Sequence, residues 1–531
     1  MPDRLPVFRL TTPQLGVKEA IALATKLFKL DVFSLPIPVL GRRLAVRAGT
    51  RVLELDPSSG GIWAADEAVL WNPAIRPTLG SEDEAQNLAR RLVDELGVAR
   101  FAADSPFQLR LQGVAGTILA LETNGKREDH RLDIHVSHGV TIDLSSIGIR
   151  EELPVVGGGG KFGVTVGDGG EVIGLNGVWR PAAESFEAAM IPQEASNAQF
   201  AEMTSGLTLE SHESFLAYYS APVFEPQEFL YPVYVHRAVA RIGEELVPMR
   251  LVNLPATDFG PIPKVPEPQP KRALTKPARA FERQPGRRGL ESRDPFEAGT
   301  SWIGTSGGLN GSQKNAKGFV DGLAAAGWTV SFNWGDQNAF ESDWRANDDD
   351  WVDAADFVFY TGHANMNGWV LTDPDGFLNF SEVGSGPQNP GDLWGQQDLE
   401  WMIIAACGPL QDDAIAKGGG SVLSRWDGAF DGLHLMMGYG GITFDNEVEG
   451  ARIVQYARQG MTLRQAWYRT GQEVQPSTNG ASAPDGPTVY VGALWVAKPG
   501  ADPAEDHLWG HGAVSPDPTS PTDIACMWVP C

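Results

Sequence analysis

The sequence predicts an α/β protein, with a C-terminal doubly wound, mostly parallel sheet and an N-terminal α+β half with antiparallel sheets. Beyond residue 296, apolar runs typical of buried strands alternate with helical patterns, as in a parallel sheet covered on both faces. Before residue 258, apolar and polar residues alternate with a period of two between Gly- and Asp-containing turns, which favours antiparallel pairing. The chain has 531 residues, 42% of them hydrophobic, which suffices for two or three domains.

A proline-rich, basic segment separates the two halves. Residues 261–293 hold seven prolines and nine Lys or Arg against three Glu, a composition typical of an extended linker. We therefore expect the following division: an accessory domain over 1–258, with two subdomains of about 1–110 and 111–258, a linker over 259–295, and an α/β domain over 296–531.

The N-terminal half contains two predicted helices and several predicted strands. The helix over 16–30 has apolar or small residues at helical spacing, Ile21, Ala24, Thr25 and Phe28. A second helix over 81–97 begins at a capping box of Ser81 and Glu84 and ends at Gly97. Strands are expected over 43–56, 107–113, 131–144, 161–179 and 231–242.

In the C-terminal half, strands and helices are predicted in turn. A helix over 313–328 would bury Ala316, Phe319, Val320 and Leu323 on one face. One long helix is expected over 447–472. The expected strands are 301–306, 329–334, 357–360, 402–406, 433–440 and 488–497.

Two of these strands end in reactive side chains. The run "FVFYTGHA" leads to His363 and "MIIAACGP" leads to Cys407. Because neighbouring parallel strands lie about 4.8 Å apart and end at one edge, an imidazole there can face a thiol and take its proton. The backbone N–H groups of Ala364 and Cys407 are the candidate oxyanion donors. The pattern favours a catalytic dyad; the alternative for Cys407 alone is a buried core thiol.

This arrangement resembles the caspase/gingipain-like clan of cysteine peptidases, in which a strand ending in His precedes a strand ending in Ala-Cys or its like. Over about 296–500 the chain also looks like bacterial proteins known mainly as a domain of unknown function in that clan. The resemblance implies a thiol protease with His363 and Cys407 as its dyad. Ala364 replaces the usual glycine, Ala405 stands where metacaspase-like members carry a pocket acid, and no third triad member is evident.

Two other functions remain open. A catalytically inactive caspase-fold scaffold or binding protein would keep the fold without the chemistry, and a thiol hydrolase or acyltransferase would use the dyad on another substrate. If the protein is a peptidase, we expect its substrate to be a peptide or protein. The sequence does not identify any substrate-binding residue.

The stretch "ELPVVGGGGKFGVTVGDGGEVIGLNGVWRP", residues 152–181, resembles the core hairpin of PepSY/fungalysin-propeptide-type modules. That resemblance implies an inhibitory or chaperoning propeptide, hence a zymogen whose N-terminal half contacts the active-site face. An ordinary hairpin is the alternative. In a zymogen the exposed linker would be the processing site, with four arginines as targets, Arg279, Arg283, Arg287 and Arg288.

The charge and hydropathy of the chain limit the classes of partner that it could bind. The formal net charge is −25, and residues 301–531 hold 29 acidic against 10 basic residues, which disfavours binding to nucleic acid. No apolar run of about 18 residues occurs, so we expect no membrane span. The N-terminus lacks a basic start followed by an apolar core, so we expect no signal peptide and a cytoplasmic location by default.

No cofactor is expected, and two weak metal candidates stand out. Asp373 and Asp375, near Asn379 and Glu382, offer oxygen ligands for calcium, although the spacing is not that of an EF-hand. A second set could bind zinc, although its spacing is unlike that of common structural zinc sites: His507, His511, Cys526 and Cys531. Three cysteines form no disulfide framework; Cys526 and Cys531 could pair or stay free.

Overall fold

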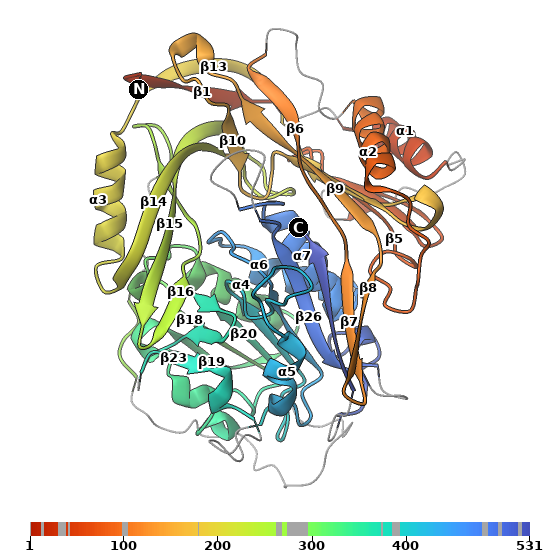
Figure 1. Ribbon diagram of the computed structural model, residues 1–531, viewed down its shortest axis with the longest axis vertical. Helices are drawn as coiled ribbons and strands as arrows, with labels where there is room; N and C mark the ends of the chain where they lie inside the picture. The colour runs from red at the N-terminus through yellow and green to blue at the C-terminus, as the bar shows by residue number, and fades with distance from the viewer. Residues whose placement is uncertain are drawn as a thin grey trace.

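The computed structural model describes residues 2–11, 15–29, 39–40, 43–97, 105–178, 180–261, 268–272, 296–372, 375–384, 393–479, 487–497, 502–518 and 523–531. Within these ranges the protein is of mixed α and β structure, with seven α-helices and three sheets of fifteen, nine and three strands. The large sheet lies in the upper part of Figure 1 and the nine-stranded sheet below it.

The fifteen-stranded sheet comes entirely from the N-terminal half. Its neighbouring strands are antiparallel except for the pair β10–β14, which confirms the antiparallel expectation for this half. The predicted hairpin over 161–179 is present as β11 and β12. The strands are β1 (Arg4–Leu10), β2 (Val39–Leu40), β3 (Arg43–Ala48), β4 (Arg51–Leu55), β5 (Ile62–Asp66), β6 (Phe107–Ala115), β9 (Ile134–Ile142), β10 (Leu153–Val156), β11 (Lys161–Val166), β12 (Val172–Val178), β13 (Ala182–Ala189), β14 (Thr208–Tyr219), β15 (Phe229–Ile242), β16 (Glu245–Pro248) and β17 (Val252–Pro255).

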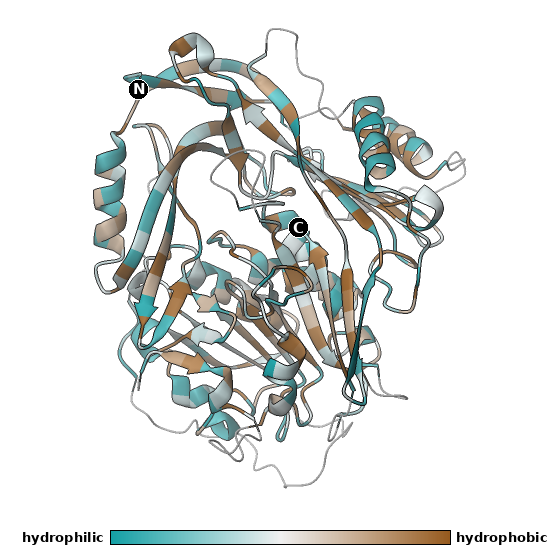
Figure 2. Cartoon of the chain, in the orientation of Figure 1, coloured by the Kyte–Doolittle hydropathy of each residue, from teal (hydrophilic) through white to brown (hydrophobic). Residues whose placement is uncertain are grey.

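Three helices accompany this sheet: α1 (Val17–Phe28), α2 (Glu82–Leu96) and α3 (Gln193–Met203). The predicted capping box of α2 is present, and Gly97 ends the helix with a φ of +68°. The predicted face of α1 is partly wrong, because Thr25 is exposed and the buried positions are Ala20, Leu23, Ala24, Leu27 and Phe28. Hydrophilic residues cover much of α2 and α3, and hydrophobic ones gather on the sheet strands (Figure 2).

The nine-stranded sheet combines parallel and antiparallel strands. Five strands in the order β19-β18-β20-β24-β25 are parallel, and the next four, β26-β27-β7-β8, continue antiparallel. The hairpin β7–β8 belongs to the N-terminal half and runs alongside β26 and β27 in Figure 1. The strands are β18 (Glu297–Trp302), β19 (Thr329–Gly335), β20 (Phe357–Thr361), β24 (Trp401–Ala405), β25 (Leu435–Tyr439), β26 (Tyr490–Val496), β27 (Asp523–Pro530), β7 (Ile118–Thr123) and β8 (Lys126–Arg131).

The two faces of this sheet are covered differently. Phe357 and Phe359 of β20 pack with α4 (Ser312–Ala324), α6 (Glu449–Arg458) and α7 (Leu463–Val474). Val358 and Tyr360 point to the other face, into a tryptophan-rich layer. That layer holds α5 (Val422–Trp426) and the three-stranded sheet of β21 (Ala364–Asn365), β22 (Gly368–Val370) and β23 (Phe377–Asn379). Long helices therefore cover one face of the described sheet, where the sequence predicted them on both.

The long helix predicted over 447–472 is wrong in one respect: it is two helices, α6 and α7. Gly460 between them has a φ of +87°, and Thr462 caps α7 through its side chain, which accepts the N–H of Gln465. A left-handed glycine followed by a capping threonine ends one helix and starts the next.

The linker is described only at residues 259–261 and 268–272, and its four arginine targets lie outside the described residues. Arg272 donates to Asn338 O, pairs with Asp343 and lies over the rings of Trp334 and Phe340. Among the described helices, none combines the length and the apolar character needed to cross a membrane.

Candidate active site

The two residues predicted as a dyad lie at the same edge of the nine-stranded sheet. β20 and β24 are parallel neighbours, and Thr361 pairs with Ala405 at their carboxyl ends. His363 and Cys407 each follow two residues later, so the chain brings both to this edge. Their side chains are buried, with 2% of His363 and none of Cys407 exposed.

The imidazole of His363 has a fixed tautomer. Nε2 lies 2.7 Å from the carbonyl oxygen of Gly307, and Nδ1 lies 3.1 Å from the backbone nitrogen of Arg250. A carbonyl only accepts and a backbone N–H only donates, so Nε2 carries the proton and Nδ1 offers its lone pair. Burial lowers the pKa of His363 to about 4, against the hydrogen bond to Gly307, so the ring is neutral.

The main-chain carbonyl of Gly307 holds this imidazole in place, and the sequence did not point to it. A third group that holds the base in one tautomer is part of the logic of nucleophilic triads. It was not visible because the group is a main-chain carbonyl, 56 residues before His363. A Cβ at Gly307 would lie 3.1 Å from the His363 ring and 2.7 Å from Ile303 Cγ2, so a glycine allows this close approach.

The hydrogen-bond partner of the Cys407 thiol is Thr443. The backbone N–H of Thr443 donates to Sγ at 3.4 Å, and Thr443 Oγ1 lies 3.7 Å away. Burial raises the pKa of Cys407, opposed by the Thr443 hydrogen bond and the nearby charge of Arg250. Among the described residues no hydrogen bond joins Cys407 to His363. The raised pKa favours the protonated thiol, and Nδ1 of His363 is bound by another donor, the N–H of Arg250.

That donor belongs to a segment of the N-terminal half, residues 245–252, which we call the strap. The strap runs from β16 to the start of β17, and its Arg250 N–H takes the Nδ1 lone pair of His363. Next to it, Leu251 pairs with the main chain beside the thiol: its N–H donates to Thr443 O at 2.8 Å, and its carbonyl accepts from Asp445 N at 2.9 Å.

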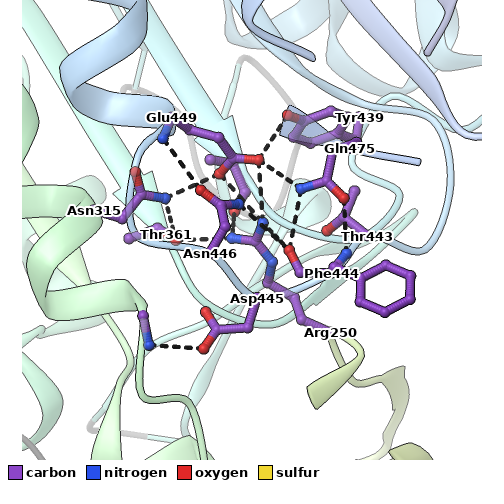
Figure 3. A network of polar contacts seen from close by, with 12 residues as sticks. Arg250, Asn315, Thr361, Tyr439, Thr443, Phe444, Asp445, Asn446, Glu449 and Gln475 are labelled. Carbon is purple, nitrogen blue, oxygen red and sulfur yellow. Dashed lines mark hydrogen bonds and ion pairs between the residues drawn. The ribbon is translucent and has the colours of Figure 1, made fainter. Parts of the chain in front are cut away.

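The side chain of Arg250 enters a ring of acceptors, which we call the guanidinium site (Figure 3). Nη1 donates to Thr361 Oγ1 at 3.0 Å and to Ala405 O at 2.8 Å, both at the ends of the dyad strands. Nη2 donates to Phe444 O at 2.6 Å and lies 3.2 Å from both carboxylate oxygens of Glu449. Both charged side chains are fully buried.

Glu449 is held in place by three neutral donors. Asn315 Nδ2 donates to Oε2 at 2.9 Å, and Tyr439 OH and Gln475 Nε2 donate to Oε1 at 2.7 and 2.8 Å. Burial and the charge of Glu449 raise the pKa of Tyr439, which keeps that hydroxyl a donor. Nothing in the run "DNEVEGARI" separates Glu449 from its acidic neighbours, so the sequence alone did not single it out.

The other end of the strap is fixed by Glu245. Its carboxylate accepts from the side-chain amides of Asn365 at 2.8 Å, Asn367 at 3.1 Å and Asn379 at 3.0 Å. Asn365 belongs to β21, which begins directly after His363. The strap is thus bound on both sides of the dyad.

The remaining predicted site residues are dispersed. Ala364 is buried in β21, where an oxyanion role for its N–H stays a prediction. Asp375 accepts the N–H of Phe377, and Asp373 lies outside the described residues. The carboxylate of Glu382 accepts the N–H of Asn379, so these two groups form a helix cap.

The predicted zinc set does not gather either. Cys526 in β27 and Cys531 just after it are free, buried thiols that belong to two different hydrophobic clusters, so no disulfide joins them. Within the described residues, a group of three acids lies close enough to hold a metal ion: Asp356, Asp398 and Glu400. None of them was a sequence candidate.

The model of a domain of unknown function, DUF6345, matches residues 297–530 of the chain. The match spans the nine-stranded sheet apart from β7 and β8 and includes His363, Cys407 and Glu449. It begins after the N-terminal residues that supply the strap. A search among curated proteins found no match.

Proposed function

We propose that the protein is a cysteine peptidase of caspase-like fold, held latent by its own N-terminal half. The observation that carries the proposal is the orientation of His363: Gly307 O binds Nε2–H, and the basic Nδ1 is left at the strand edge that also bears Cys407. A ring nitrogen placed in this way is the proton acceptor that a thiol nucleophile needs.

The reaction would proceed through a thioester. Nδ1 of His363 takes the thiol proton while Sγ of Cys407 bonds to the carbonyl carbon of the substrate. The C–N bond then breaks, and the amine leaves with the proton held by His363. Water next attacks the thioester, its hydroxyl joins the acyl group, and its second proton returns to the sulfur. The N–H groups of Ala364 and Cys407 are the proposed donors to the oxyanion.

The strand order supports the caspase-like part of the proposal. The strands β19-β18-β20-β24-β25 are parallel, and an antiparallel β26 lies beside them. The proposed base, His363, follows β20 and the proposed nucleophile, Cys407, follows β24, which are the third and fourth of these parallel strands in chain order. A fold alone does not assign a function, so the proposal rests on the site.

The alternative with a specific observation in its favour is an inactive scaffold protein. The thiol is fully buried and is hydrogen-bonded to Thr443 instead of the imidazole. In the latent peptidase the same burial arises because the strap covers the edge, and it is reversible. The two functions therefore differ in what happens when the strap is loosened.

A loosened strap provides the test. Glu245→Ala in the full-length chain removes the acceptor of three asparagine amides and leaves Cys407 and His363 in place. We expect at least one member of a set of peptidyl acyloxymethyl ketones, differing in the side chain next to the reactive carbonyl, to label Cys407 in this variant. Mass spectrometry locates the label.

Three controls accompany it. Glu244→Ala alters an exposed neighbour and should behave as the unmodified chain does. Cys407→Ala and His363→Asn, each placed in the Glu245→Ala background, should lose the label. Labelling that persists without Cys407, or a strap that opens by hydrogen exchange while no ketone labels the thiol, would contradict the peptidase.

A further inference from the structure

Arg250 does more than cover the dyad, because its contacts have the form of a bound peptide. Its backbone N–H meets the catalytic imidazole, the next residue pairs with the main chain of Thr443 and Asp445, and its side chain fills a charged site. Main-chain pairing combined with a side-chain site is how extended peptides are recognised.

The guanidinium site is built from groups that belong to the C-terminal half. Its acceptors are Thr361 Oγ1, Ala405 O, Phe444 O and the carboxylate of Glu449, all within residues 297–530. Removal of the strap would leave these acceptors without their cation. Glu449 would keep its three neutral donors, so its carboxylate has a fixed position before any ligand arrives.

The acceptors are spaced for a planar fork. Nη1 serves the two strand ends, and Nη2 serves Glu449 and Phe444 O, so two separate nitrogens are satisfied at once. A lysine ammonium is a single point charge and reaches fewer of these groups. The chemistry therefore selects arginine.

We infer that the guanidinium site is the specificity site of the peptidase, that it takes the arginine side chain flanking the scissile bond of a substrate, and that Arg250 occupies it as an internal substrate mimic. This inference rests on the proposed function. The selecting acid is Glu449 at the start of α6, whereas sequence comparison with metacaspase-like members pointed to the position of Ala405.

The first experiment measures the site without catalysis. Arg250→Ala in the full-length chain empties the guanidinium site, and ethylguanidinium should then raise the melting temperature in a saturable way. The unmodified chain, whose site is filled, should not respond saturably, and ethylammonium should act more weakly. Arg250→Ala combined with Glu449→Gln should lose the response. A response equal for both cations, or none in a folded Arg250→Ala protein, overturns the inference.

The second experiment measures selectivity and keeps Arg250, so it also serves if Arg250→Ala does not fold. In the Glu245→Ala variant, an arginyl acyloxymethyl ketone should label Cys407 about tenfold faster or more than its citrulline isostere, which has the same shape without the charge. Adding Glu449→Gln should bring the two rates close together.

The outcomes separate the inference from the proposed function. Equal labelling by the arginine and citrulline probes leaves the peptidase intact and overturns the specificity site. If no probe labels Cys407 in any variant, the peptidase fails, and saturable ethylguanidinium binding then shows an arginine-binding site that serves another purpose, which also overturns the inference.

Discussion

Two buried arginine–glutamate networks join the N-terminal half to the C-terminal half, and they are built differently. In the first, which we call the interface cluster, Arg43 and Glu54 of the N-terminal half meet Arg469 and Glu473 of α7. In the second, the guanidinium site, Arg250 alone crosses from the N-terminal half to Glu449. Each half supplies both charges to the first network, whereas the second has its cation from one half and its acid from the other.

The surroundings of the cations differ as well. Arg469 lies 3.9 Å over the ring of Trp63 and Arg43 lies 3.8 Å over that of Phe224, so flat aromatic faces hold both guanidinium groups. Arg250 is held by the main-chain carbonyls of Ala405 and Phe444, and its Nε has no hydrogen-bond partner among the described residues. The cations of the interface cluster are thus packed against aromatic rings, whereas hydrogen bonds hold Arg250. This contrast is the one expected if Arg250 occupies a binding site, as we propose.

The largest effect that we expect is a loss of folding stability when the interface cluster is broken. Arg469→Met removes the cation that binds Glu54 and Glu473 and leaves both carboxylates buried. Burial alone would raise the pKa of Glu54, but Arg469 and Arg43 outweigh it and lower that pKa to about 2. We expect the free energy of unfolding to fall by about 3–5 kcal/mol, measured by urea denaturation followed by tryptophan fluorescence.

Reactivity of Cys407 should not change in Arg469→Met, since the strap and its contacts are intact. Arg458→Met on α6 is the matched control, because Arg458 is exposed and its loss should change stability by less than about 0.5 kcal/mol. A rise in Cys407 labelling with Arg469→Met would mean that the two networks act as one unit.

The next largest effect that we expect is local and concerns the contact between Arg250 and Glu449. Glu449→Gln removes the charge that faces Arg250 and keeps a side chain of the same size. Because the strap can move Arg250 into water without global unfolding, we expect hydrogen exchange at the amides of Arg250 and Leu251 to accelerate about 10- to 100-fold. Exchange in α7, next to the interface cluster, should stay as it is.

Glu447→Gln is the control for this variant, since Glu447 lies two residues away and pairs with the exposed Lys314. Equal acceleration at the strap and in α7 would show that Arg250 is a structural contact like Arg469, and the distinction between the two networks would be lost.

Some residues of the candidate site could be predicted from the sequence, and others could not. The placement of His363 and Cys407 at one sheet edge was predicted because short-range patterns put them after buried strands, and parallel neighbours end at one edge. Gly307, Arg250 and Glu449 were missed because their roles depend on contacts between residues 56 to 199 positions apart. No local pattern encodes a main-chain carbonyl aimed at an imidazole, or a glutamate buried by three neutral donors.

The fold shows the same division. Strands with period-two alternation and helices with capping signals, such as α2, were predicted close to their observed bounds. The hairpin β7–β8 could not be assigned to the C-terminal sheet, because its pairing with β27 joins residues about 400 positions apart. The short elements around Trp369 and Trp394 lack helical periodicity, so the sequence predicted long helices on that face, where a small three-stranded sheet and the short helix α5 lie.

The smallest effect that we expect is a pH dependence of folding stability that arises from Asp445, next to the guanidinium site. Asp445 accepts the N–H of Gly311 beside Arg250 and Glu449, and burial raises its pKa to about 6, against the charge of Arg250. A carboxyl with a folded-state pKa above its unfolded value of 3.8 binds more protons when folded, so its contribution to stability is lost as the pH rises from about 4 to about 6. Asp445→Asn keeps an acceptor for Gly311 and cannot titrate. Free energies of unfolding measured by urea denaturation from pH 4 to 7 should therefore show the unmodified chain losing about 1–3 kcal/mol relative to Asp445→Asn across that window. A constant difference between the two proteins over this range would contradict the raised pKa and would mean that Asp445 is already ionised at pH 4 in the folded protein.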